Sequence, residues 1–210
     1  PVLGSNDERT KAQMTLMATE MGQSAPPMSE ESDEALMVRI CAGERLAFTA
    51  LLDRHLKAVA GFAYRMLMDT AEAEDVAQET FLRLWRNRNK WRPEAKLRTW
   101  LFRVARNLCI DRFRRKEVVT DQIPEQVDPR GGPSADLQRS QSAGLVNNAV
   151  AQLPERQRAA ISLVYHQDLS NIEAAGILGV SVDALESLLS RGRRGLKKRL
   201  EELKPHLLEE

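Results

Sequence analysis

Apolar residues recur at helical spacing along most of this chain, and strand-like alternation is hard to find. The clearest pattern covers residues 97–116, which contain no Gly or Pro. One stripe of this segment is formed by Leu97, Trp100, Leu101, Val104 and Leu108. Phe102, Ile110 and Phe113 fall outside that stripe, so the helix has more apolar surface than one packing face needs. The pattern predicts a central helix that packs on several sides.

The same periodicity predicts an all-α fold of two helical domains. Expected helices cover residues 33–42, 44–68, 71–85, 97–116, 137–152, 154–166, 171–178 and 182–203. Residues 117–138 contain the Pro, Gly and Asp clusters that are typical of a flexible linker. The domains are therefore expected at 33–116 and 139–210. The polar residues 1–32 precede them; 1–5 look like an expression scar, and the remainder is expected to be disordered or to form a short helix.

The last two expected helices have the features of a helix-turn-helix. Ser170 and Glu173 match a capping box, and Gly179 supplies a turn before Ser181, which can cap the final helix. A short helix, a glycine turn and a second helix are typical of duplex DNA binding. The alternative is an ordinary amphipathic helix in a bundle, for which these features and the basic run 191–199 would coincide by chance.

The net charge of the chain says little about its function, but the distribution of charged residues along the sequence is informative. The chain has 210 residues, 42% of them hydrophobic, and a formal net charge of +1. An acidic cluster at 69–79 precedes a stretch, 83–116, in which Glu94 and Asp111 are the only acids, and 191–199 contain none. Two basic zones are typical of two contacts with a polyanion, although two solvated helix faces give the same pattern.

Signals for catalysis, metal binding or membrane insertion are weak. Cys41 and Cys109 are far apart and form no CxxC motif, which favours a reducing cytosol. The three histidines lack ligand spacing, and no GxGxxG, GxxxxGK[ST] or GxSxG motif occurs. No apolar run approaches the roughly 20 residues of a membrane span. We expect a cytoplasmic protein that is not an enzyme and holds no metal or cofactor.

Three surfaces carry candidate chemistry. The final helix presents small polar residues and arginines, which suit base edges and phosphates. Trp91 lies in a basic loop, a composition that suits the stacking of an unpaired base, although it can equally cover the core. A mixed acidic and apolar face on the third helix could dock a partner, or could be a solvated helix side; its residues are Asp75, Gln78, Glu79, Leu82 and Trp85.

Together these segments resemble the sigma-70 family, and within it the extracytoplasmic-function (ECF, group IV) sigma factors. The segment AEDVAQETFLRLW at 73–85 resembles the core-binding segment, and WRPEAKLRTWLFRVARNLCIDRFRR at 91–115 resembles the −10 region. Region 4 is matched by LPERQRAAISLVYHQDLSNIEAAGILGVSVDALESLLSRGRRGL at 153–196. The three segments occur in the family's order, with a linker at the expected place.

The resemblance implies a bacterial alternative sigma factor that directs promoter-specific initiation by RNA polymerase. The face on 73–85 would bind the β′ clamp of the core enzyme, which also contains the β subunit. The implied −10 contacts are Trp91, Arg92, Lys96, Arg103, Arg106, Asn107, Arg114 and Arg115. The implied −35 contacts are Glu186, Ser187, Ser190, Arg191, Arg194 and Lys198. The family also implies control by an anti-sigma factor.

The recognition helix departs from the family's pattern at its start. The family usually has a Thr-Val-(Lys/Arg)-Ser-Arg run, where this chain has Ala184-Leu185-Glu186-Ser187-Leu188. The two basic residues of the family's run are absent from this chain, and at one of these positions, Glu186, the charge is reversed. A carboxylate can accept a hydrogen bond from cytosine N4 but is repelled by phosphate. We therefore expect a −35 element unlike the family's common one.

Two other function classes remain open from the residues alone. A helix-turn-helix regulator would bind duplex DNA without entering RNA polymerase, and a helical adaptor would bind only proteins. Residues 73–115 discriminate between these classes, because a plain regulator needs neither a clamp-docking face nor a base pocket. Weak salt dependence of DNA binding would favour the adaptor.

Overall fold

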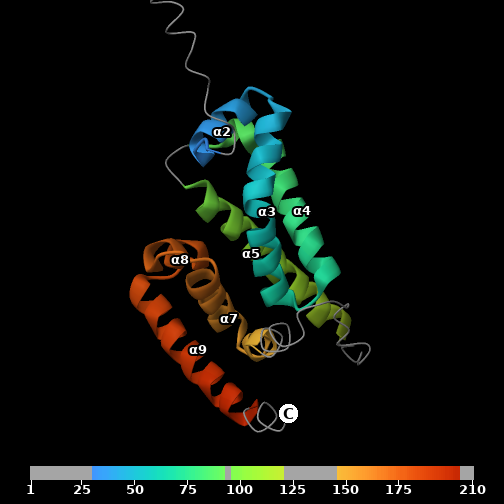
Figure 1. Ribbon diagram of the computed structural model, residues 1–210. Helices are drawn as coiled ribbons and strands as arrows, with labels where there is room; N and C mark the ends of the chain where they lie inside the picture. Colours follow the sequence, from blue (N-terminus) through green and yellow to red (C-terminus); the bar gives the residue numbers. More distant parts are fainter. Residues whose placement is uncertain (1–29, 93–95, 121–145, 204–210) are drawn as a thin grey trace, which may run out of the picture.

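The computed structural model describes residues 30–92, 96–120 and 146–203, and its ordered elements within these ranges are helices. The expected all-α fold is confirmed for this part of the chain. The elements are α2 (Asp33–Cys41), α3 (Arg45–Leu67), α4 (Thr70–Asn87), η1 (Arg88–Lys90), α5 (Leu97–Thr120), α7 (Glu155–Ile161), η2 (Ser162–His166), α8 (Asn171–Leu178) and α9 (Val182–Leu203). They form an N-terminal bundle, α2–α5, and a C-terminal bundle, residues 146–203 (Figure 1).

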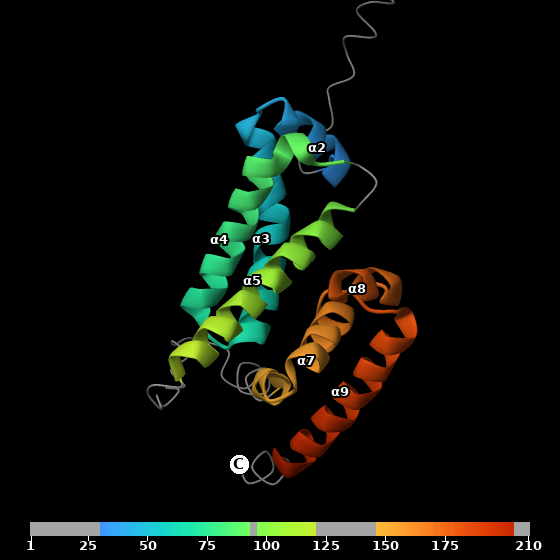
Figure 2. The same cartoon turned by 180° about the vertical axis from the view of Figure 1, so that it is seen from behind.

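Helix α5 packs on several sides, as its apolar pattern predicts, but α3 is the helix that contacts α2, α4 and α5 within the N-terminal bundle. Helix α5 packs against α3 and α4 within the bundle, and against α8 of the C-terminal bundle (Figure 2). Leu101 and Phe102 are buried, and the Phe102 ring meets Phe62 of α3 edge-on, with ring centroids 5.5 Å apart. Phe102 lies outside the main stripe of α5, so the extra apolar surface has a packing partner.

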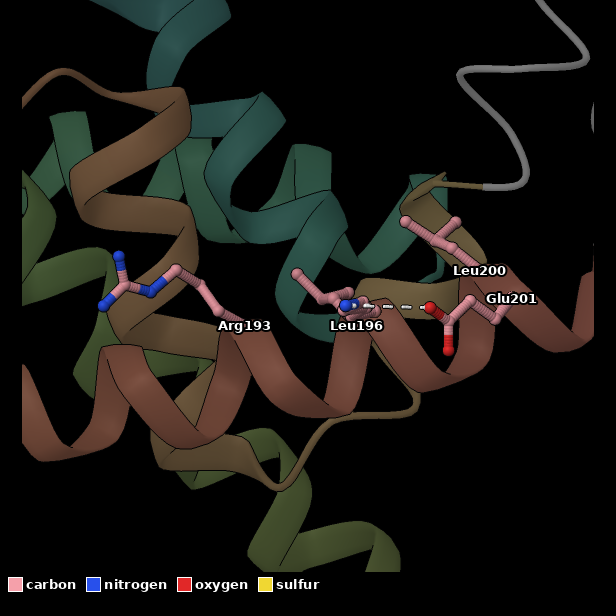
Figure 3. A pocket seen from close by; sticks show the side chains of 5 residues that line it. Arg193, Leu196, Leu200 and Glu201 are labelled. Atoms are coloured by element: carbon pink, nitrogen blue, oxygen red, sulfur yellow. Dashed lines mark ion pairs between the residues drawn. The ribbon is translucent and has the colours of Figure 1, made fainter.

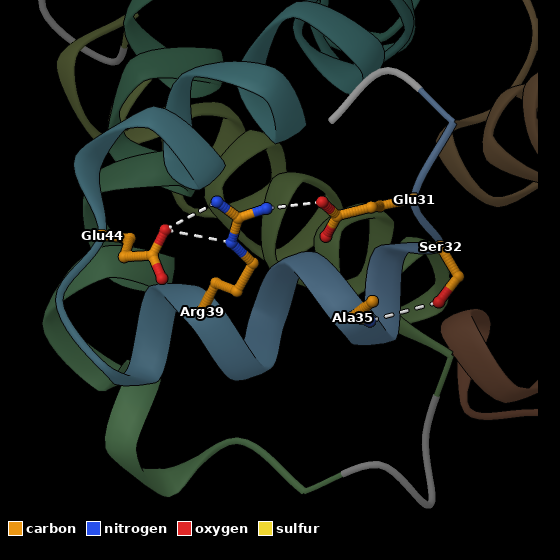
Figure 4. Close-up of polar contacts among 5 residues, drawn as sticks. All are labelled: Glu31, Ser32, Ala35, Arg39 and Glu44. Atoms are coloured by element: carbon orange, nitrogen blue, oxygen red, sulfur yellow. Dashed lines mark hydrogen bonds and ion pairs between the residues drawn. The ribbon is translucent and has the colours of Figure 1, made fainter. Parts of the chain in front are cut away.

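Helix α2 packs on one end of this bundle through buried Leu36, Met37 and Ile40, and local polar contacts fix its two ends (Figure 4). The Ser32 hydroxyl caps the helix by accepting a hydrogen bond from the Ala35 amide at 3.2 Å. Arg39 joins Glu31, at 2.5 Å, to Glu44, at 2.8 Å, across the turn into α3. That turn contains Gly43 at φ +90°, a conformation that glycine adopts without steric cost.

The C-terminal bundle contains the predicted helix-turn-helix. Ser170 and Glu173 form the complete capping box of α8, and Gly179 ends the helix in the left-handed conformation at φ 67°. Ser181 then caps α9, accepting from the Ala184 amide at 3.2 Å. Leu185 and Leu189 of α9 are buried against the rest of this bundle.

Several helix boundaries differ from the sequence prediction. Helix α5 continues to Thr120, beyond the expected end at residue 116 and into the segment read as a linker. The expected helix 154–166 is an α-helix only over Glu155–Ile161, because Pro154 is its N-cap and Ser162–His166 form one turn of π-helix. Residues 146–151 are helical, whereas 137–145, the rest of the linker and 1–29 lie outside the described residues.

Candidate nucleic-acid and polymerase interfaces

Helix α9 presents the predicted −35 residues on its outer face. Leu185 and Leu189 anchor the helix, and the face turned away from them is polar. Glu186, Ser187, Arg191, Arg194 and Lys198 are exposed, and Ser190 is half-buried. Glu186 also accepts a hydrogen bond from the Asn171 side-chain amide of α8, at 3.5 Å. The six side chains therefore share a surface on one helix, with a carboxylate near its start.

A second face of α9 carries an open pocket that the sequence pattern did not predict (Figure 3). Leu196 and Leu200 form its apolar floor, and the charged residues around it are Arg193, Lys197 and Glu201. Lys197 and Glu201 form an ion pair at 3.9 Å. Leu200 lies on the same apolar stripe of the helix as Leu189, but it is only half-buried and lines this pocket. Helical periodicity predicts the side of α9 on which Leu200 lies, but it does not predict whether another helix covers that side.

The predicted −10 residues divide into two groups. Arg92, Asn107, Arg114 and Arg115 are exposed. Lys96, just before α5, and Arg103 and Arg106 of α5 contact or face the C-terminal bundle, although Lys96 and Arg103 are also exposed. Lys96 pairs with Glu173 at 2.9 Å, and Arg103 donates to the Gly176 carbonyl at 3.1 Å. Arg106 is half-buried, and burial lowers its pKa, with Glu155 and Arg156 of the C-terminal bundle as its charged neighbours.

Trp91 is half-buried and packs against the N-terminal core. Its indole Nε1 is buried and has no hydrogen-bond partner within the described residues. Part of the ring therefore covers the core, and the part that stays exposed is the surface available for stacking a base. The neighbouring residues 93–95 lie outside the described ranges, so the base pocket of this loop stays a prediction.

The mixed face of α4 lies on the outside of the N-terminal bundle. Asp75, Gln78 and Leu82 are exposed, with Leu82 at 47% although it is apolar. Trp85 is held between Phe48, with ring centroids 5.1 Å apart, and the Arg88 guanidinium 4.4 Å away. The hydrogen bond from Arg83 at 2.8 Å lowers the pKa of the Glu79 carboxyl. The face combines a fixed aromatic ring, an exposed leucine and carboxylates, which suits a protein partner.

The described residues contain no group of three or more His, Cys, Asp or Glu side chains that could hold a metal ion. Cys109 is buried, and burial raises the pKa of its thiol to about 12, so it is a small core residue and not a nucleophile. Cys41 is exposed and donates to the Arg88 carbonyl at 3.1 Å. None of the helices in the described ranges is long and apolar enough to span a bilayer.

Sequence comparison identifies both bundles. The profile of sigma-70 region 2 matches residues 51–118, and that of sigma-70 region 4 matches residues 144–196. The chain is 38% identical to the ECF RNA polymerase sigma factor SigL of Mycobacterium tuberculosis H37Rv, over 77% of this chain and 93% of SigL. It is 33% identical to the ECF RNA polymerase sigma factor SigW of Bacillus subtilis strain 168, over 77% of this chain and 92% of SigW.

Solved structures agree with this assignment. CnrH, in complex with the cytosolic domain of CnrY, matches with a TM-score of 0.64 and 28% identity, over 82% of this chain and 99% of that one. RpoE of Bartonella quintana, in complex with the anti-sigma factor NepR, matches with a TM-score of 0.60 and 28% identity, over 73% of this chain and 96% of that one. The chain therefore belongs to the sigma-70 family, among the ECF RNA polymerase sigma factors.

Proposed function

We propose that this chain binds RNA polymerase core and directs promoter-specific initiation in the bacterial cytoplasm. The N-terminal bundle would dock on the β′ clamp through α4 and capture the −10 element, and α9 would read the −35 duplex. The observation that carries the proposal is the presence, in one chain, of an apolar and acidic outer face on α4 and a basic recognition face on α9. A plain helix-turn-helix regulator has no use for the first of these.

The proposed opening step is a competition between base stacking in DNA and base binding by the protein. Taking one base out of the stack costs a few kcal/mol. Stacking on an aromatic side chain returns about 1–3 kcal/mol per base, and arginines that bind the backbone add to it. Trp91 and Asn107 would hold the base, with Arg114 and Arg115 on the backbone. Because the exposed strand is bound only when unpaired, binding favours the open promoter.

An anti-sigma factor is the expected regulator. CnrH and RpoE of Bartonella quintana both match this fold and were each solved with a bound partner, named an anti-sigma factor in the second case. By family likeness, an inhibitor that contacts both bundles would block polymerase docking and DNA binding together.

The test is transcription by purified core polymerase on a promoter library. The wild-type chain should select a promoter subset. Trp91→Ala should bind these promoters but fail to open them, as read by thymine reactivity in the −10 element, while Trp91→Phe should retain opening. Arg191→Ala should lose −35 docking, and Arg193→Ala, on the neighbouring face of the same helix, should not. Failure of the wild-type chain to associate with core polymerase would refute the proposal.

A further inference from the structure

Four basic side chains where the two bundles meet have a buried nitrogen with no hydrogen-bond partner among the described residues. They are Arg65 of α3, Arg106 of α5, and Arg158 and His166 of the C-terminal bundle; the atom is Nε in each arginine and Nδ1 in the histidine. Buried polar groups in proteins are normally hydrogen-bonded. The junction therefore holds nitrogens that its own acceptors do not satisfy, and two of their side chains, Arg65 and His166, are close enough to interact electrostatically.

Two hydrogen bonds fix the position of the Arg65–His166 pair between α3 and the C-terminal bundle. Arg158 donates to the carbonyl of the residue that follows Arg65 in the sequence. Gln167, which follows His166 and is buried, donates to the Ala58 carbonyl of α3 at 3.3 Å. The guanidinium and the imidazole are therefore held at one place, with an anchored contact on either side.

Gly61 gives the Arg65 guanidinium its place on α3. A Cβ added at Gly61 would be 3.5 Å from Arg65 Nη2 and 3.8 Å from Nη1, so the guanidinium lies over the glycine, one turn back along the helix. Burial lowers the pKa of this guanidinium, and no carboxylate in the described part of the chain raises it. The group nevertheless stays charged, and its planar fork of N–H donors matches an oxyanion that accepts two hydrogen bonds.

His166 supplies the second group of the pair. Burial lowers the pKa of its imidazole and the Arg65 charge lowers it further, whereas a hydrogen bond to the Ile161 backbone and the Asp168 charge act in the opposite direction. Asp168 is exposed, so solvent screens its charge. An anion beside the pair would remove the repulsion between the two cations and favour the imidazolium, whose Nδ1 then carries a proton to donate.

We propose that Arg65 and His166 bind a tetrahedral oxyanion, the phosphate group of a small ligand, between α3 and the π-helical turn η2. The guanidinium would donate two hydrogen bonds to it and the imidazolium a third. A phosphate suits this pair better than a carboxylate does, because it carries up to two charges and has three free oxygens for donors that come from two elements. Neither residue belongs to the faces assigned to DNA or polymerase, so this site is separate from them.

Inorganic phosphate and pyrophosphate are the probes, titrated into the full chain at pH 6.5 with chloride keeping the ionic strength constant. The NMR resonance of the His166 Cε1 proton, identified by its loss in His166→Gln, should shift and reach saturation. Arg65→Gln should weaken binding roughly tenfold, because charge-assisted hydrogen bonds are lost. Arg45→Gln is the matched control, since this exposed arginine begins the same helix; its affinity should stay within about twofold of wild type.

Sulfate, whose charge does not change between pH 5.5 and 7.5, isolates the contribution of the imidazole. Wild type should bind sulfate more tightly at pH 5.5, because binding favours the protonated form of His166, and bound sulfate should raise the pKa of His166. His166→Gln, followed by backbone amide resonances of α3, should bind sulfate more weakly at pH 5.5 and lose the dependence on pH. A merely structural role of His166 would not produce this change.

Thermal melting checks that each variant is folded, and Arg65→Lys serves if Arg65→Gln is not. The lysine keeps the charge but not the fork, so it should still bind phosphate several-fold more weakly than wild type. Tighter binding of pyrophosphate than of phosphate would support a ligand with linked phosphates, and equal binding would support a single phosphate group. A His166 resonance that does not shift or does not saturate, or equal losses in Arg65→Gln and Arg45→Gln, would show ionic screening only and overturn the site.

Discussion

Gly192 of α9 lies so close to Ile161 of α7 that a Cβ added at the glycine would be 2.9 Å from Ile161 Cγ1. This contact is shorter than carbon atoms tolerate, and Cγ1 is not the free end of a flexible chain. The two helices therefore approach closely only because position 192 has no side chain. The recognition helix depends on this approach for its orientation.

Gly192→Ala should lower the free energy of unfolding of the C-terminal bundle. Overpacking costs roughly 1–3 kcal/mol, more than the roughly 0.5–1 kcal/mol that Ala gains over Gly within a helix. Gly176→Ala is the matched control, because its Cβ would meet only the Arg103 guanidinium at 3.9 Å. That variant should be equally stable or more stable. Urea unfolding of both variants measures the difference, and equal stability of Gly192→Ala and wild type would contradict the packing argument.

Leu82→Ala should weaken binding to RNA polymerase core with little effect on folding. Leu82 is 47% exposed, so its truncation removes little buried surface in the free chain. An apolar anchor at an interface is typically worth about 1–2 kcal/mol, which corresponds to roughly five- to thirtyfold in Kd. Val38→Ala, at 66% exposure on α2, is the control. Titration of labelled core polymerase measures both, and a similar loss in both variants would exclude a specific role for the α4 face.

Glu186→Arg should tighten binding to duplex −35 DNA. The change removes a carboxylate that phosphates repel and adds a donor, worth about 1 kcal/mol or roughly fivefold. The dependence of affinity on salt should also steepen by about one phosphate contact. Glu202→Arg makes the same charge change far along α9. Unchanged or weaker binding of Glu186→Arg across a set of −35 sequences would contradict the repulsion between this carboxylate and the phosphates.

Acidification should destabilise the C-terminal bundle through His166. Burial lowers the pKa of this imidazole, and the nearby Arg65 charge lowers it further, whereas a hydrogen bond to the Ile161 backbone and the Asp168 charge act in the opposite direction. The unfolded chain, with an ordinary histidine pKa, then binds the proton more readily than the folded chain. The stability that neutral His166 contributes is therefore fully present above about pH 6.5, and it falls as the pH drops below this value. Denaturant unfolding at pH 7.5 and 5.5 measures this loss, which should be smaller in His166→Gln.

The local part of the fold could be predicted from the sequence because its causes lie within one or two helical turns. The Ser170–Glu173 capping box, the Gly179 turn and the Ser181 cap each involve residues that are neighbours along the chain. The surplus apolar surface of α5 likewise predicted a helix packed on several sides. The predicted boundaries of helices were less accurate where the hydrophobic period carries no signal, as at the π-helical turn of Ser162–His166.

Only the tertiary structure decided which of these surfaces meet. Lys96 and Glu173 are 77 residues apart in sequence, and Arg103 and Gly176 are 73 apart. The charge pattern of the sequence identifies Lys96 and Arg103 as cations that can bind an anion. It does not show that α8 of the same chain supplies the acceptors. The sequence pattern likewise did not show that Trp91 packs on the core or that Leu200 lines an open pocket, because both depend on which helices lie beside them. Burial depends on which neighbour arrives from far along the chain, whereas helix formation depends on residues three and four positions away.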